Sequence, residues 1–171
     1  MPNGWEALVG ELQNKYDPKT SAHKVKNVCK QCCIYGKADG VLYASHPAGF
    51  KLESYTHEVE QEDGSMNGVA VDEFKCAVAA AAGNRGGGNQ GAGIRMGNTK
   101  FMMIRPSPEV DHGAYLSRQG GGGATVTSTD KCIIVGIWDK DMPMSNKQMQ
   151  NTGDCADVVE KMTKFLKKQG M

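Results

Sequence analysis

The sequence predicts an α+β fold, in which helices flank one antiparallel sheet. Both ends of the chain carry amphipathic helical patterns, over residues 3–16 and 154–168. Between them lie a strand–turn–strand pattern over 28–43 and a series of short apolar runs, separated by turn residues, over 100–138. The order helix, hairpin, helix, meander, helix gives this fold class.

The first helix is expected over residues 3–16, with Asn3 as its cap. Its apolar side chains recur at the i, i+3, i+4 spacing and form one stripe: Trp5, Leu8, Val9, Leu12 and Tyr16. A strand over 28–35 follows, turns at Asp39-Gly40 and returns through Val41–Tyr43. Asp-Gly between apolar runs is a strong hairpin signal, so these two strands should pair.

The pattern of residues 51–70 predicts an additional β-hairpin, an arm rich in acidic residues. Tyr55, His57 and Val59 alternate along the outgoing strand, and a turn at 62–64 precedes a return strand that includes Val69. The acidic residues of the arm are Glu53, Glu58, Glu60, Glu62 and Asp63.

A second helix is expected over 71–82, because Ala and Lys favour helices and Gly83-Asn84 would end one. After a glycine-rich connector over 86–93, four strands should form an antiparallel meander: 100–105, 115–116, 124–129 and 132–138.

The segment 142–151 is polar and Met-rich, which favours a loop or a short helical insert. The final helix should direct its apolar face to the core through Cys155, Val159, Met162 and Leu166. Phe165 falls at the boundary of that face.

Length and charge limit the class of protein. A chain of 171 residues suits one domain, and 20 Lys+Arg against 19 Asp+Glu leave a net charge of +1. Nucleic-acid binders need a cationic face, so no nucleic-acid partner is expected. No apolar run approaches the roughly 18 residues of a membrane span, and no secretory signal is recognisable. The six cysteines are therefore interpreted as reduced thiols of a cytoplasmic protein.

No motif predicts an enzyme, a metal site or a cofactor. Cys29 and Cys32 form a C-x-x-C, but no second pair of ligands stands at zinc spacing, and strand alternation would place Cys32 and Cys33 on opposite faces. Asp139 begins a stretch that lacks the glycine of a calcium loop.

Several segments, in order along the chain, resemble the profilin family of actin-monomer-binding proteins. They are Gly4-Trp5, Asp39–Ser45, Gly97–Arg105, Thr127–Lys131, Ile133–Asp139 and Cys155–Met171. The resemblance covers residues 3–50, 72–82, 96–141 and 152–171. It implies a central antiparallel sheet with the N- and C-terminal helices packed together on one face. The chain would be a single domain over 1–171 and a divergent member, with insertions at about 51–70 (the acidic hairpin) and 142–151.

The resemblance implies a groove for polyproline formed by Trp5, Leu8, Tyr43, Phe165 and Met171. Polyproline II segments have little backbone freedom to lose, so flat aromatic faces bind them at a low ordering cost. Leu8 stands where the family usually has Tyr, and Tyr43 where it often has Trp, which predicts weaker or altered binding. The alternative is that Trp5, Leu8 and Phe165 are core residues of two packed helices.

The resemblance also implies an actin-binding surface made of Lys100, Met102, Arg105, Arg118, Asp157 and Lys161. Exposed apolar and basic groups suit a partner with an acidic rim. The alternative for Lys100 and Arg105 is that they are solvated charges of an edge strand. The turn after Arg118 is rich in glycine, whereas many members of the family have a more basic turn there. Phosphoinositide lipids should therefore bind weakly at most.

The expected function is to bind monomeric actin and regulate its polymerisation, linking it to proline-rich proteins such as formins, in the cytoplasm and cytoskeleton. The arm would either reach further actin surface or be a tolerated insertion. One alternative is an adaptor or phosphoinositide-binding signalling module without strong actin affinity. A more remote one is a metal-redox protein or enzyme that uses the cysteine cluster.

Overall fold

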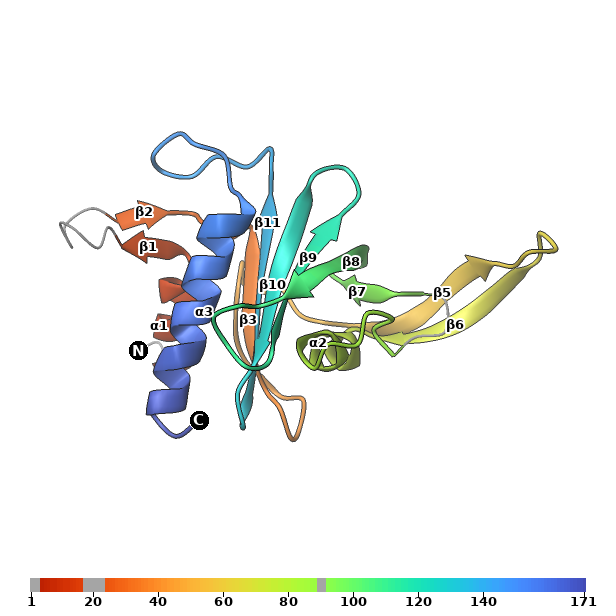
Figure 1. Cartoon of the computed structure of the whole chain (residues 1–171), viewed down its shortest axis with the longest axis horizontal. Coiled ribbons are helices and arrows are strands. Elements are labelled where there is room, and N and C mark those ends of the chain that lie inside the picture. Colours follow the sequence, from red (N-terminus) through yellow and green to blue (C-terminus); the bar gives the residue numbers. More distant parts are fainter. Residues whose placement is uncertain (1–3, 17–23, 89–91) are drawn as a thin grey trace.

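The computed structural model describes residues 4–16, 24–88 and 92–171 (Figure 1). Its helices lie on the two faces of a central sheet. Helices α1 (Gly4–Glu11) and α3 (Thr152–Lys168) cover one face, and α2 (Glu73–Ala81) covers the other. The predicted α+β class, with the terminal helices packed together, is confirmed.

Every neighbouring pair in the seven-stranded sheet is antiparallel, and the strand order is β4-β3-β11-β10-β9-β8-β7. The strands are β3 Gln31–Gly36, β4 Leu42–His46, β7 Ile94–Met96, β8 Thr99–Pro106, β9 Gly113–Arg118, β10 Gly122–Ser128 and β11 Cys132–Asp139. The predicted hairpin (β3–β4) and meander (β8–β11) are both present. They join through β3 and β11, where Ile34 lies opposite Ile134.

Strand β7 was missed by the sequence interpretation, which ended the connector at residue 93 and assigned no element to residues 94–99. Gly97 and Asn98 connect β7 to β8 and both have positive φ, of 58° and 56°. A pair of such residues forms the primed turn that two-residue hairpins prefer. Gly-Asn between Met96 and Thr99 is therefore the signal that could have revealed this strand.

The first helix is shorter than predicted. It ends at Glu11, and Asn14–Tyr16 forms strand β1, which pairs with β2 (Lys24–Lys26). Gly10 weakens the helix near that point, and the strand pairing satisfies the backbone groups of residues 14–16 instead. Leu12 remains fully buried. The proposed cap, Asn3, lies outside the described residues.

The arm is a two-stranded hairpin of β5 (Ser54–Glu60) and β6 (Met66–Asp72), which extends away from α2 (Figure 1). Its strands follow the predicted alternation, with Tyr55 opposite Val71. Helix α2 begins two residues later than predicted, because Asp72 is its N-cap and accepts a hydrogen bond from Lys75 N. It ends as expected at Gly83, whose φ of +92° suits the residue after a helix C-cap.

The sheet separates two apolar cores. Cys33, Ile133 and Val135 belong to the α2-side core, and Cys32 and Ile134 belong to the core beneath the terminal helices. The prediction that Cys32 and Cys33 point to opposite faces is therefore confirmed. The predicted core face of α3 is also buried: Cys155, Val159, Met162 and Leu166.

The segment 142–151 is a loop. Pro143 and Met149 form an isolated bridge, and the buried side chain of Gln150 donates a hydrogen bond to Asn27 O at 2.8 Å. Within the described residues, no helix has the length and apolar character needed to cross a membrane.

Candidate functional site

Two aromatic side chains are in contact where α1 packs on β4, near the C-terminal end of α3. The rings of Trp5 and Tyr43 have centroids 4.5 Å apart and planes inclined by 32°. Trp5, Leu8, Tyr43 and Met171 are all partly buried against the core beneath the terminal helices. Met171 is fixed there because its backbone N donates to Leu166 O at 3.0 Å. We call Trp5, Leu8, Tyr43, Met171 and Phe165 the terminal surface.

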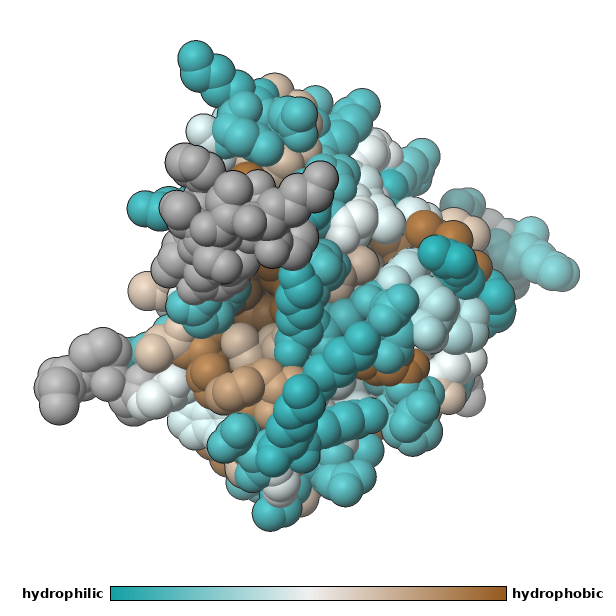
Figure 2. Space-filling view, turned by 60° about the vertical axis from the view of Figure 1, so that its left-hand side comes forward, coloured by the Kyte–Doolittle hydropathy of each residue, from teal (hydrophilic) through white to brown (hydrophobic). Residues whose placement is uncertain are grey.

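Phe165 lies on α3 and is 45% exposed. At 100° per residue it falls on the flank of α3 that carries Val158 and Met162, opposite the flank of Glu160 and Lys164. Lys164 pairs with Glu109 in the β8–β9 connection, so Phe165 lies on the flank of α3 that faces away from this connection. Apolar atoms are visible on this side of the molecule, surrounded by hydrophilic side chains (Figure 2).

A second surface lies along β8, where strand alternation separates buried from exposed side chains. Phe101 and Met103 face the α2-side core, whereas Met102 is 69% exposed and Ile104 is 51% exposed. The β8–β9 register shifts between Met103 and Arg105, and this irregularity places Arg105 opposite Tyr115. Two exposed apolar side chains and a cation therefore lie together on one strand.

Arg105 also lines a groove of about 470 Å³ between the β8–β9 pair and α3. The guanidinium of Arg105 lies 5.2 Å from the centroid of the Tyr115 ring. Asp157 and Lys161 come from α3 and form an i,i+4 ion pair of 3.0 Å. The structure thus brings three of the predicted actin-binding residues, Arg105, Asp157 and Lys161, into one groove. Met102, on the same strand as Arg105, lines a different hollow.

Lys100 and Arg118 do not join this groove. Lys100 is exposed and lines a separate hollow of about 430 Å³ with Met102 and Arg85. Arg118 has the same strand parity as Leu116, so it lies on the α2 side of the sheet.

The guanidinium of Arg118 is paired with Asp139 at 2.8 Å, and Lys30 contacts the same carboxylate at 3.3 Å. A backbone hydrogen bond from Asp141, together with Lys30 and Arg118, lowers the pKa of Asp139. Arg118 therefore forms an ion pair within the protein and lies outside the groove of Arg105.

Two residues of the groove were not found from the sequence. Tyr115 and Glu160 are both buried, and the Tyr115 hydroxyl donates a hydrogen bond to the Glu160 carboxylate. The Ser107 hydroxyl also donates to Glu160, at 3.3 Å. Desolvation and the neighbouring Glu160 raise the pKa of Tyr115 to about 12. In the sequence, Tyr115 and Glu160 are simply two polar residues far apart in the chain. Only the packing of α3 against β9 brings them together.

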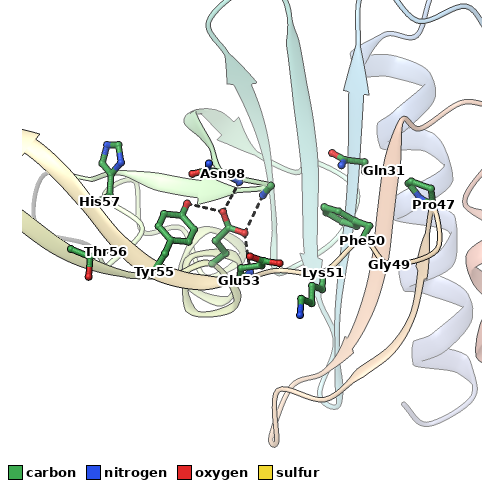
Figure 3. Close-up of a pocket in the computed structure, with 12 residues that line it drawn as sticks. Gln31, Pro47, Gly49, Phe50, Lys51, Glu53, Tyr55, Thr56, His57 and Asn98 are labelled. Carbon is green, nitrogen blue, oxygen red and sulfur yellow. Dashed lines mark hydrogen bonds between the residues drawn. The ribbon is translucent and has the colours of Figure 1, made fainter.

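The base of the arm holds a buried carboxylate that sequence analysis also missed. Glu73 is fully buried and accepts four hydrogen bonds. The donors are Glu53 N at 3.0 Å, the Tyr55 hydroxyl at 2.8 Å, Gly97 N at 3.1 Å and Asn98 N at 2.7 Å (Figure 3). These bonds join α2 to β5 and to the β7–β8 turn, so the arm is fixed to the domain at its base.

Arg95 reinforces this junction from β7. It is buried, and it donates to the Tyr55 hydroxyl at 3.0 Å and to Asn98 O at 3.1 Å. His57 Nε2 lies 3.5 Å from the same guanidinium. A cavity of about 680 Å³ opens beside the junction, lined also by Phe50 and Gln31 (Figure 3).

The six cysteines are free and buried. Cys29 and Cys155 are in contact, with their sulfur atoms 3.8 Å apart. The hydrogen bond to Cys155 and burial raise the pKa of Cys29, and burial raises the pKa of Cys32 to about 12. Among the described residues, no group of three or more His, Cys, Asp or Glu side chains is arranged to hold a metal ion.

Comparisons with known proteins agree with this architecture. The profile of the profilin family matches residues 5–171. A profilin from Tetrahymena pyriformis is 28% identical over 137 residues, which are 80% of this chain and 86% of that protein.

Solved structures are similar in fold. Profilin IA from Acanthamoeba castellanii superimposes with a TM-score of 0.60 at 21% identity, over 98% of this chain and 100% of the other. Mouse profilin IIa, solved in complex with a double repeat from the FH1 domain of mDia1, gives a TM-score of 0.55 at 18% identity, over 98% and 99% of the two chains.

Proposed function

The chain belongs to the profilin family, which is non-enzymatic, and on that premise we propose that it binds monomeric actin and regulates actin polymerisation. The observation that carries the proposal is the surface where Met102, Ile104 and Arg105 lie beside the α3 pair Asp157–Lys161.

The composition of this surface fits a protein partner. Met102 and Ile104 are both more than half exposed, which is costly for large apolar side chains unless another surface covers them. Arg105 next to them provides a positive charge that can steer a partner with an acidic rim. Apolar burial would supply most of the affinity, and the charges would orient the complex.

Proline-rich proteins such as formins are the second proposed partner, and the terminal surface is their site. Trp5 and Tyr43 offer a tilted pair of aromatic faces. Polyproline II segments expose carbonyl groups and no N–H, so an indole N–H or a phenol O–H is a suitable donor to them. A phenol is protonated at neutral pH, and desolvation raises the pKa of Tyr43 further, so its hydroxyl is available as a donor. The mouse relative in complex with an FH1 repeat supports this partner class.

The remaining parts of the proposal concern organisation and location. We regard the chain as one domain in which the arm and the loop 142–151 are additions to the family's fold, and we expect it in the cytoplasm with the actin cytoskeleton. Phosphoinositide binding should be weak at most, because Arg118 is already paired with Asp139.

Titration of fluorescently labelled monomeric actin tests the proposal. Met102→Glu should weaken binding by at least about tenfold, since it places a charge at the apolar centre of the contact. Val41→Glu is a matched control, because Val41 is 50% exposed in the β3–β4 connection, at the opposite edge of the sheet from β8, and its substitution should leave binding unchanged. Absence of binding by the wild-type protein at roughly tens of micromolar would reject the proposal.

A further inference from the structure

The basic side chains around the α3 groove differ in whether they have an ion-pair partner. Three lysines of α3 are paired: Lys161 with Asp157, Lys164 with Glu109 and Lys167 with Asp111, at 3.0, 3.0 and 3.8 Å. Arg105 is exposed and has no ion pair with any described residue. It is therefore the cation of this groove that remains available to a carboxylate from outside.

Arg105 is nevertheless held in place. Its guanidinium lies over the Tyr115 ring, 5.2 Å from the centroid. The irregular register between Met103 and Arg105 brings the two residues opposite each other on β8 and β9. A guanidinium is planar and weakly hydrated, so it stacks on an aromatic face and keeps its N–H groups free for a carboxylate.

The Tyr115 ring beneath Arg105 is itself fixed by a hydrogen bond. Tyr115 is only 7% exposed, and its hydroxyl donates to the carboxylate of Glu160, which is 6% exposed on α3. Ser107, at the end of β8, donates to the same carboxylate oxygen at 3.3 Å. A buried acceptor with two hydroxyl donors fixes the position of the phenol ring relative to both β8 and α3.

We infer that Tyr115 and Glu160 are positioning residues, which order the Arg105 side chain before a carboxylate of the partner arrives. The inference rests on the proposed binding of actin and names the chemistry that Arg105 recognises there. A free arginine loses much rotamer freedom on binding, and a side chain ordered in advance has already lost it. Neither positioning residue needs to touch the partner.

A double-mutant cycle on actin affinity tests this inference. Arg105→Ala should weaken binding about tenfold, and Tyr115→Leu about fivefold. In the Arg105→Ala background, Tyr115→Leu should change the affinity less than about twofold, because no guanidinium is left to order. Raising the salt concentration should reduce the effects of both single substitutions together, since both act through the charge of Arg105.

Conservative variants separate positioning from a loss of folding. Glu160→Gln retains an acceptor for the Tyr115 hydroxyl, so it should bind actin within about twofold of the wild type. Tyr115→Phe retains the ring but loses the hydrogen bond to Glu160, so its affinity should fall between those of the wild type and Tyr115→Leu. Glu160→Leu removes the acceptor and should resemble Tyr115→Leu, again only when Arg105 is present. Circular dichroism and thermal unfolding report whether each variant is folded.

The outcomes distinguish this inference from the proposed function. If the wild type binds actin and the cycle is additive, or if Arg105→Ala has no effect, the positioning role is wrong and the proposed function stands. If the wild type does not bind actin, the proposed function fails and this inference fails with it.

Discussion

Trp5 of α1 and Tyr43 of β4 are in aromatic contact, with ring centroids 4.5 Å apart. The contact joins the first helix to the edge strand of the sheet, so the two rings hold each other's orientation at the surface. Such a tilted pair contributes beyond the apolar area that it buries. It also gives the terminal surface a fixed centre, to which Leu8 and Met171 add apolar area.

The Trp5–Tyr43 pair should report directly on proline-rich ligands. We expect an octaproline-length peptide to change the fluorescence of the wild-type protein. Trp138→Phe should retain this change and Trp5→Phe should lose it. Trp138 lies near the end of β11, whereas the neighbours of Tyr43 on β4 are aligned, through β3, with the start of β11. Tyr43→Ala should weaken binding about five- to tenfold in calorimetry, through loss of one aromatic face. Equal affinity of Tyr43→Ala and the wild type would exclude Tyr43 from the site.

Phe165 and its neighbour Leu166 should separate binding from stability. Phe165 is 45% exposed and Leu166 is 2% exposed. Leu166→Ala should lower the free energy of unfolding by about 2–5 kcal/mol, as for other buried leucines. Phe165→Ala should cost much less stability and should weaken binding of the proline peptide. Urea unfolding and peptide titration measure the two effects, and a Phe165→Ala protein that is strongly destabilised but binds normally would mark Phe165 as a core residue.

Glu73 should control the order of the arm. Glu73→Leu leaves four hydrogen-bond donors without their buried acceptor, so we expect the free energy of unfolding to fall by about 1–3 kcal/mol. Glu73→Gln retains one acceptor oxygen and should be less severe. Amide hydrogen exchange in β5 and β6 should become faster in both variants. Glu58→Leu, at an exposed arm position, serves as the control and should leave exchange at Glu53 and Asn98 as in the wild type.

Asp139 should make stability depend on pH in the acidic range. Its pKa is lowered in the folded protein by the hydrogen bond from Asp141 N and by Lys30 and Arg118. The carboxylate therefore stabilises the fold above the pKa of an unfolded Asp, about 4, and this contribution is lost as the pH falls through the lower folded value.

The variant Asp139→Asn tests this sign. It should be less stable than the wild type at pH 7, and the difference in free energy of unfolding should narrow below about pH 4. Asp130→Asn, at an exposed position, should show no such convergence. A difference between Asp139→Asn and the wild type that stays constant down to pH 2 would contradict the prediction.

Elements with a clear local pattern could be predicted from the sequence. The apolar period of α3 predicted this helix and its buried face, and the apolar runs separated by turn residues predicted β8–β11. The Asp-Gly turn gave the β3–β4 pair, and the ordered motifs gave the family. Three local features were missed: the end of α1, where strand pairing of Asn14–Tyr16 replaced the helical period, the strand β2 that pairs with it, and β7, which has the charged Arg95 at its centre.

The candidate site could be predicted only in part. The positions of residues in the sequence do not show which strands are neighbours in the sheet or which face a side chain lies on. Arg105, Asp157 and Lys161 meet in one groove, whereas Arg118 points to the other side of the sheet and pairs with Asp139.

What the amino-acid order alone determined was most of the helices and strands and the buried face of α3, since periodicity involves residues a few positions apart. Tertiary structure decided which polar groups meet. Tyr115 and Glu160 are 45 residues apart, and Tyr55 and Glu73 are 18 apart. Each carboxylate is buried only because strand order and helix packing bring donors to it, and an isolated segment holds no information about such partners.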